Sequence, residues 1–121
     1  MGIGDGRLRV TLRLEGLVVF LLAVGYYFLN DYSLILFLVL LLAPDIGMIG
    51  YAINTKTGAA VYNLFHTYSI PLLFIFLSMF TKQDTLLMVG LIWTAHIGMD
   101  RALGYGLKYS TGFKDTHLGK L

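Results

Sequence analysis

Four long apolar stretches, joined by connectors of only three to five residues, dominate the sequence. Each stretch is close to the ~20 residues that a helix needs to cross ~30 Å of hydrocarbon. Connectors this short make neighbouring helices run antiparallel. The sequence therefore predicts an all-α integral membrane protein, a four-helix up-down bundle that forms a single domain over residues 1–121. The expected spans are about 12–29, 33–53, 59–80 and 85–107, followed by a polar tail at 108–121.

The composition supports a membrane protein and excludes several other classes. Hydrophobic residues make up 57% of the chain and charged residues only 13%, whereas a soluble domain carries about 25% charged residues. The formal net charge of +2 is too small for a nucleic-acid binder. Because there are no cysteines, disulfides, thiolate metal sites and iron–sulfur clusters are excluded. The apolar composition makes the lipid bilayer the first expected partner.

Lysine and arginine are distributed unevenly between the two sides of the expected bundle. An even number of spans places both termini and the second connector on one side. That side holds seven cationic residues, and the opposite side holds only Lys82. The seven are Arg7, Arg9, Arg13, Lys56, Lys108, Lys114 and Lys120. The positive-inside rule therefore predicts that both termini lie in the cytoplasm.

Several polar side chains fall inside the expected spans, where an Asp or Arg costs at least ~2.5–3.5 kcal/mol. At ~1.5 Å per residue from the cytoplasmic end, Asp45 lies ~12 Å deep, His66 and Asp100 ~10 Å, and His96 ~16 Å. Glu15 and Asn63 are shallower, at ~5–6 Å. Because successive spans alternate in direction, sequence spacing alone does not produce this agreement in depth. The pattern predicts one polar layer in the cytoplasmic half of the bundle.

The residue types in this layer point to a metal. His96 and Asp100 are four residues apart and share one helix face, as do Asn63 and His66, three apart. Imidazoles and carboxylates together suit zinc, manganese or iron. We expect a divalent metal held by Asp45, His66, His96 and Asp100. His117 joins these ligands if the tail folds back over the cytoplasmic mouth of the bundle; a solvated tail is the alternative.

A metal beside a spare carboxylate activates water, which is a common hydrolytic arrangement. The leading interpretation is therefore a membrane-embedded hydrolase that acts on a lipid or another amphiphile from the cytoplasmic leaflet. In it, Glu15 is the general base or an outer-shell residue, and Asn63 and Arg101 orient the substrate. The motifs GxSxG and HExxH, which mark other hydrolases, do not occur in the sequence.

Three segments also resemble a known family. They are LLAPDIGMIGY (41–51), YNLFHTY (62–68) and AHIGMDRALGYGLKYSTGFKDTHLG (95–119). They resemble domain-of-unknown-function family 4260, and the likeness extends from LRLEG (12–16) over nearly the whole chain. The resemblance implies a small four-span protein of the bacterial inner membrane with no assigned activity. The Asp and His pattern is also remotely similar to putative inner-membrane metal-dependent hydrolases.

Other functions remain open at this point. A small proton-coupled transporter would use Glu15 and Asp45, although the cluster of Asp and His departs from the single-Glu pocket of small multidrug exporters. A haem protein would use His66 and His96 as axial ligands. A purely structural protein is the fourth possibility. Exposed glycine faces would suit a homodimer.

Overall fold

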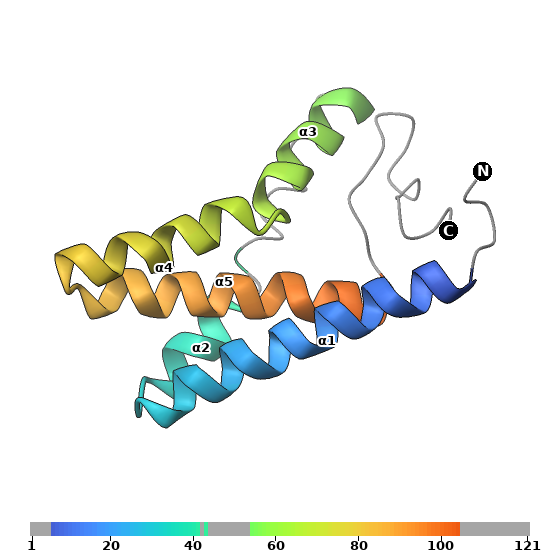
Figure 1. Ribbon diagram of the computed structural model, residues 1–121. Helices are drawn as coiled ribbons and strands as arrows, with labels where there is room; N and C mark the ends of the chain where they lie inside the picture. The colour runs from blue at the N-terminus through green and yellow to red at the C-terminus, as the bar shows by residue number, and fades with distance from the viewer. Residues whose placement is uncertain (1–5, 42, 44–53, 105–121) are drawn as a thin grey trace.

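The computed structural model describes residues 6–41, 43 and 54–104, and every regular element in these residues is a helix (Figure 1). The helices are α1 (Gly6–Leu29), α2 (Leu34–Leu40), α3 (Thr55–Phe65), α4 (Ser69–Thr81) and α5 (Asp84–Leu103). The all-α prediction is thus confirmed for this part of the chain. The second expected span beyond Leu40 falls largely outside the described residues, and the tail at 108–121 does so entirely.

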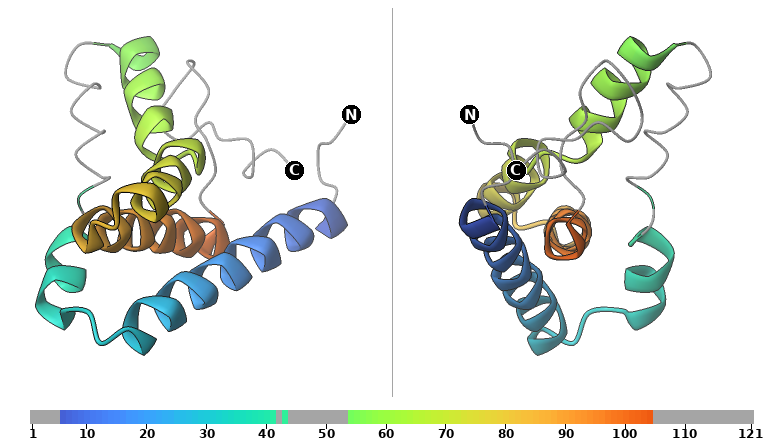
Figure 2. Two further views of the ribbon diagram at one scale, coloured as in Figure 1. Left: turned by 60° about the vertical axis from the view of Figure 1, so that its left-hand side comes forward. Right: turned by 90° about the vertical axis from the view of Figure 1, so that its right-hand side faces the viewer.

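Helix α5 is the centre of the fold. It packs along α1 and along α4, and it touches the short α2 (Figures 1 and 2). Half of its residues are buried, from Gly90 to Arg101. Helices α1 and α4 run in the same direction, and α5 runs against both (Figure 1). These relative directions are those that an up-down bundle requires of its first, third and fourth spans.

Two glycines bring α1 and α5 into backbone contact. A Cβ atom added at Gly98 would lie 2.7 Å from the Gly16 carbonyl oxygen and 2.7 Å from the Phe20 nitrogen. A Cβ atom added at Gly16 would clash with the Cβ of Arg101. Gly90 serves the contact with α4 in the same way, because its added Cβ would meet Ile75 and the Pro71 carbonyl. These glycines therefore lie at the contacts of α5 with α1 and α4, and they fix the position of α5 between these two helices.

The apolar core lies at the opposite end of α1 from its arginines. It consists of Ala23, Tyr27, Phe37, Leu91, Ile92 and Ala95, from α1, α2 and α5. Tyr27 is fully buried, and its hydroxyl donates a 2.7 Å hydrogen bond to the Ser33 carbonyl. The Ser33 side chain in turn accepts from the Leu36 N–H and caps α2. The core therefore holds the connector between the first two helices as well as α5.

The third expected span is helical but not continuous. In place of one helix over 59–80, α3 ends at Phe65 and α4 begins at Ser69, so that His66, Thr67 and Tyr68 form a break. Figure 1 shows α3 leaving α4 at a steep angle. Pro71 explains the break, since it has no N–H to donate to the Thr67 carbonyl and its ring crowds that carbonyl. The break places His66 at the corner between the two helices.

Two helix boundaries also differ from the sequence prediction. Helix α1 begins at Gly6, so Arg7, Arg9 and Arg13 belong to it although the span was expected to start near Leu12. Helix α5 ends at Leu103, whereas the span was expected to run to Leu107. Gly104 ends it by adopting φ +97°, and its N–H returns to the carbonyls of Arg101 and Asp100. A residue with this left-handed conformation commonly terminates a helix.

Among the residues that the structure describes, three helical stretches are long and apolar enough to cross a membrane. They are Arg7–Leu29, Thr55–Thr81 and Asp84–Leu103. Large hydrophobic side chains are exposed along α1, α2 and α4, for example Leu22, Ile35 and Phe80. A soluble monomer rarely exposes so much contiguous apolar surface. The distribution suggests a membrane protein, in which lipid would cover these side chains.

Candidate metal centre

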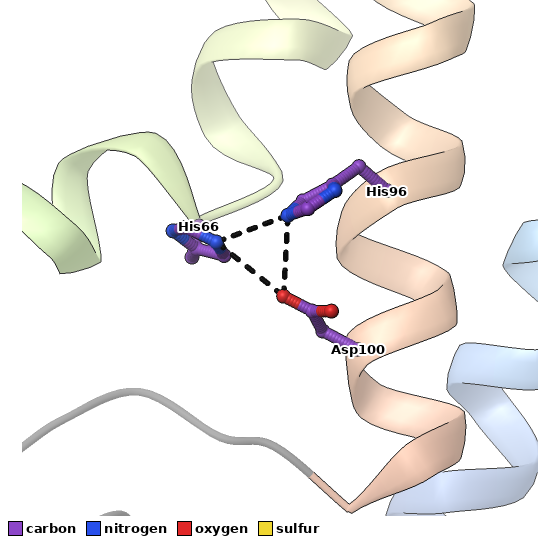
Figure 3. A group of neighbouring side chains, drawn as sticks. All are labelled: His66, His96 and Asp100. Atoms are coloured by element: carbon purple, nitrogen blue, oxygen red, sulfur yellow. Dashed lines mark hydrogen bonds and ion pairs between the residues drawn. The ribbon is translucent and has the colours of Figure 1, made fainter. Parts of the chain in front are cut away.

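Three side-chain atoms converge on one point between α5 and the break that separates α3 from α4 (Figure 3). His66 Nε2 lies 3.1 Å from His96 Nε2. Asp100 Oδ2 lies 3.3 Å from the first of these nitrogens and 3.2 Å from the second. The three atoms thus form a nearly equilateral triangle. This is the only group of three or more potential ligand residues in the described part of the chain.

Two features of the local structure bring these side chains together. His96 and Asp100 are one turn apart on α5, which places both on the same face, as the sequence predicted. His66 comes from a different direction, because it is the residue at which α3 ends. All three are buried, with 0% of His66, 1% of His96 and 8% of Asp100 exposed. The cluster is therefore an interior feature that the fold assembles from two separate segments.

The ring of His66 is held by the preceding turn of α3. Its Nδ1 lies 2.9 Å from the Tyr62 carbonyl oxygen. A carbonyl only accepts, so His66 Nδ1 carries a proton and donates to it. The Tyr62 ring also stacks on the imidazole, at 3.8 Å between centroids and 7° between planes. Tyr62 therefore fixes both the tautomer and the orientation of the ring, as outer-shell partners of metal-binding histidines do.

The protonation state of His66 determines what the triangle can hold. With the proton on Nδ1, a neutral His66 presents only a lone pair at Nε2. Asp100 Oδ2 also presents lone pairs when ionised, and a neutral His96 has at most one Nε2 proton to share. At least one edge of the triangle then joins two lone pairs without a hydrogen between them. A cation at the centre, either a metal ion or an additional proton, removes this repulsion.

The size of the triangle fits a metal ion. Nitrogen and oxygen ligands stand ~2.0–2.2 Å from zinc, which places neighbouring ligands of a tetrahedral site ~3.3–3.5 Å apart. The observed edges of 3.1, 3.2 and 3.3 Å are slightly shorter. Two imidazoles and one carboxylate are also a common ligand set of catalytic zinc and of non-haem iron. Small adjustments of the side chains would therefore complete three metal–ligand bonds.

The same distances do not suit a haem. Two axial imidazole nitrogens stand about 4 Å apart across the iron, twice a typical metal–nitrogen bond. The porphyrin ring must also fit between the two imidazoles. His66 Nε2 and His96 Nε2 are in direct contact at 3.1 Å, and both contact the same carboxylate. The arrangement thus favours a single small cation over haem.

Two side chains from α5 occupy the helix break itself. Arg101 Nη2 donates a 2.9 Å hydrogen bond to the His66 carbonyl, and Trp93 Nε1 donates a 2.6 Å bond to the Phe65 carbonyl. The last carbonyls of a helix lack partners within it, and here the neighbouring helix supplies them. This arrangement was not predicted from the sequence. Pro71 is the sequence feature that could have predicted it. A proline near the start of α4 interrupts the continuity of α4 with the preceding helix α3.

The remaining predicted site residues have different positions. Glu15 is exposed on α1, beside a shallow depression, and is not part of the three-residue cluster. Asn63 is half-buried near the end of α3, and its carbonyl accepts a hydrogen bond from the His66 N–H. Asp45 and His117 lie outside the described residues. Of the four principal ligands expected from the sequence, the structure thus brings together His66, His96 and Asp100.

The comparison with known families places the chain clearly. The family described as "Domain of unknown function (DUF4260)" matches residues 9–121. Since the match covers nearly the whole sequence, the chain belongs to this family, as its motifs indicated. No curated protein and no solved structure matches the chain. The chemistry of the site must therefore be argued from its own geometry.

Proposed function

We propose that this member of the DUF4260 family is a membrane-embedded, metal-dependent enzyme. His66, His96 and Asp100 hold one divalent cation, with zinc, manganese or iron as the candidates that suit this ligand set. The observation that carries the proposal is the buried triangle of two imidazole nitrogens and one carboxylate oxygen, with edges of 3.1–3.3 Å. A cation there would also compensate the cost of an ionised Asp100 in an apolar interior.

The reaction class that we propose is hydrolysis of a lipid or another amphiphile from the cytoplasmic leaflet. Three protein ligands leave a coordination position for water or substrate, as catalytic metal sites do. A metal at such a site lowers the pKa of its bound water and polarises the substrate carbonyl or phosphoryl group. The burial of the cluster and the exposed hydrophobic surface of α1 and α4 favour a substrate that arrives from the bilayer.

Other residues keep their predicted roles within this proposal. Glu15 is the candidate general base or outer-shell carboxylate, and Asn63, one turn before His66, is the candidate for orienting substrate. Asp45 and His117 remain candidates for completing the ligand set. Glu15→Gln and Asn63→Ala should lower turnover more than metal affinity, because neither residue belongs to the triangle.

The proposed setting is the bacterial inner membrane. The protein would cross it four times, as an up-down bundle with both termini in the cytoplasm. The seven-to-one partition of lysine and arginine between the two sides supports this orientation. In this arrangement the C-terminal half of α5, which carries His96 and Asp100, is the cytoplasmic half. The proposed assembly is a homodimer in which an exposed helix face of one copy packs against that of the other.

Elemental analysis of the full-length protein, purified in detergent without added metal or chelator, tests the metal centre. We expect about one zinc, manganese or iron per chain, lost on dialysis against a chelator and regained on titration. Absence of metal, together with failure to bind added Zn²⁺, Mn²⁺ or Fe²⁺, would contradict the proposal. The three side chains would then be better explained as a hydrogen-bonded proton relay.

Hydrolysis is tested separately, with the metal-loaded and metal-free protein in vesicles made from bacterial inner-membrane lipids. Mass spectrometry of the lipid fraction should detect a hydrolysed product only with the loaded protein. The loaded Glu15→Gln variant tests the proposed role of that carboxylate, since it should bind metal but form less product. Stoichiometric metal without any product would retain the metal centre and reject hydrolysis of these lipids.

A further inference from the structure

We infer that Arg101 is a positioning residue of the metal centre, and that it acts through the backbone of the ligand His66. The sequence suggested that Arg101 orients a substrate. Its guanidinium instead donates to the His66 carbonyl at 2.9 Å, inside the protein. This inference rests on the proposed metal site and adds to it a determinant of affinity outside the ligand set.

Two neighbouring residues of α5 contact His66, one at its side chain and the other at its backbone. Asp100 contacts its imidazole Nε2, and Arg101 contacts its carbonyl oxygen. A residue in a helix break lacks the full set of backbone hydrogen bonds that a helix interior would provide. Arg101 supplies one of them from the helix that carries the other two ligands. The distance between the His66 backbone and α5 is thereby set by the same turn that places Asp100.

The position of Arg101 is itself fixed. Only 9% of the residue is exposed, and a Cβ atom at Gly16 would clash with the Arg101 Cβ. The backbone of α1 therefore lies directly against the base of this side chain. An arginine packed in this way has little freedom to swing toward a substrate. Its planar guanidinium is well suited to hold one carbonyl in a fixed direction.

The charge of Arg101 makes the inference testable by the sign of an effect. A cation beside a metal site opposes binding of a second cation, so removing it should tighten metal binding if charge were its only contribution. Replacing a residue that orients substrate should leave the metal affinity unchanged or raise it slightly. Only a positioning role predicts that a neutral variant of Arg101 binds metal more weakly, although it has lost a repulsive charge.

The experiment measures Zn²⁺ affinity and the visible spectrum of the Co²⁺-loaded protein, using the full chain in detergent micelles. Arg101→Gln should bind Zn²⁺ about 10–100-fold more weakly, the usual effect of losing an outer-shell partner. Its Co²⁺ spectrum should change, because a displaced His66 alters the geometry at the metal. Arg101→Lys, which keeps a donor on a long side chain, should recover part of the affinity.

Arg13 provides a matched control. Its Nε donates a 2.9 Å hydrogen bond to the Ala102 carbonyl, so it also joins a guanidinium to a backbone carbonyl, but it holds no ligand residue. Arg13→Gln should leave both the Zn²⁺ affinity and the Co²⁺ spectrum unchanged. Circular dichroism of each variant verifies that helix content is retained. If Arg101→Gln fails to fold, the altered spectrum and lowered affinity expected of Arg101→Lys become the deciding results.

The outcomes separate this inference from the proposed function. Unchanged or tighter Zn²⁺ binding by Arg101→Gln, when the wild type binds, would overturn the positioning role and leave the metal centre intact. An equal loss in Arg13→Gln would overturn it as well, since any disturbance of the helix packing would then suffice. A wild-type protein that binds no metal would reject the proposed function, and this inference with it.

Discussion

His66 Nε2 and His96 Nε2 lie 3.1 Å apart in the interior, although 30 residues separate them in the chain. Because His66 donates its Nδ1 proton to the Tyr62 carbonyl, its Nε2 faces His96 as an acceptor. Asp100 Oδ2 adds a second acceptor within 3.3 Å of both nitrogens. The pair is thus arranged to share something positively charged, and this determines how the protein should respond to mutation and to pH.

Each residue of the triangle should be indispensable for metal binding. His66→Ala, His96→Ala and Asp100→Ala each remove one of three bonds, so each should lower affinity by more than the ~10–100-fold expected for an outer-shell residue. Competition with a chromophoric chelator measures this in detergent. Retention of wild-type affinity by any one of the three would exclude that residue as a ligand.

Thr94→Val is the control for those variants. Thr94 lies on α5, two residues before His96, and is also buried. Within the described residues its hydroxyl oxygen has no hydrogen-bond partner. Replacing such a group by an apolar one of the same shape is nearly neutral or stabilising. Thr94→Val should therefore bind metal like the wild type and melt at the same or a higher temperature.

Metal binding should weaken as the pH falls. A histidine binds metal through a neutral nitrogen, so His66 Nε2 and His96 Nε2 must be free of protons when the metal is bound. Protons therefore compete with the metal for these nitrogens, and affinity should decrease as the pH is lowered. Isothermal titration in buffers of different ionisation enthalpy should also detect proton release on binding. A pH-independent affinity would argue against histidine ligands.

Much of the site could be predicted from the sequence because its determinants are local or follow from depth. The pairing of His96 with Asp100 follows from helix periodicity, and the approach of His66 was predicted from its similar distance to the expected cytoplasmic end of its span. The role of Arg101 could not be predicted in this way. It depends on the break at His66, where a carbonyl becomes available to a side chain from another helix. Only the tertiary packing determines which side chain reaches it.

Glu15 illustrates the limit of the depth argument. Distance along a span places a residue at a level in the membrane, but it does not say which way the side chain faces. Gly16 is one of the residues of α1 that contact α5, and its lack of a side chain permits close approach there. The adjacent Glu15 is consequently exposed. The small residue beside it was the sequence feature that could have indicated this orientation.

The proposed topology predicts a cytoplasmic C-terminus. Reporter fusions after Leu121 should show activity for a reporter that functions only inside the cell, and none for one that functions only in the periplasm. The physical reason is the concentration of lysine and arginine on the side that holds both termini. A fusion in the connector around Lys82 and Gln83 should give the opposite result. A periplasmic C-terminus would imply an odd number of spans and would remove the basis of the depth argument.

Gly98→Ala should destabilise the contact between α1 and α5. Its new Cβ would meet the Gly16 carbonyl oxygen and the Phe20 nitrogen, each at 2.7 Å. Both are backbone atoms and cannot move aside without shifting the helix. Overpacking of this kind costs about 1–3 kcal/mol of unfolding free energy. Unfolding in mixed micelles with increasing SDS, followed by circular dichroism, measures the change.

Gly25→Ala is the matched control, since it makes the same chemical change at an exposed position of α1. A Cβ atom added at Gly25 would meet no described heavy atom within 4 Å beyond its chain neighbours and the backbone of its own helix. Alanine is also the better helix former, by about 0.8–1.0 kcal/mol per residue. Gly25→Ala should therefore be neutral or stabilising in the same titration. A destabilisation by Gly25→Ala as large as that by Gly98→Ala would mean that loss of glycine anywhere on these helices matters, and that the close approach at Gly16 and Gly98 does not set the position of α5.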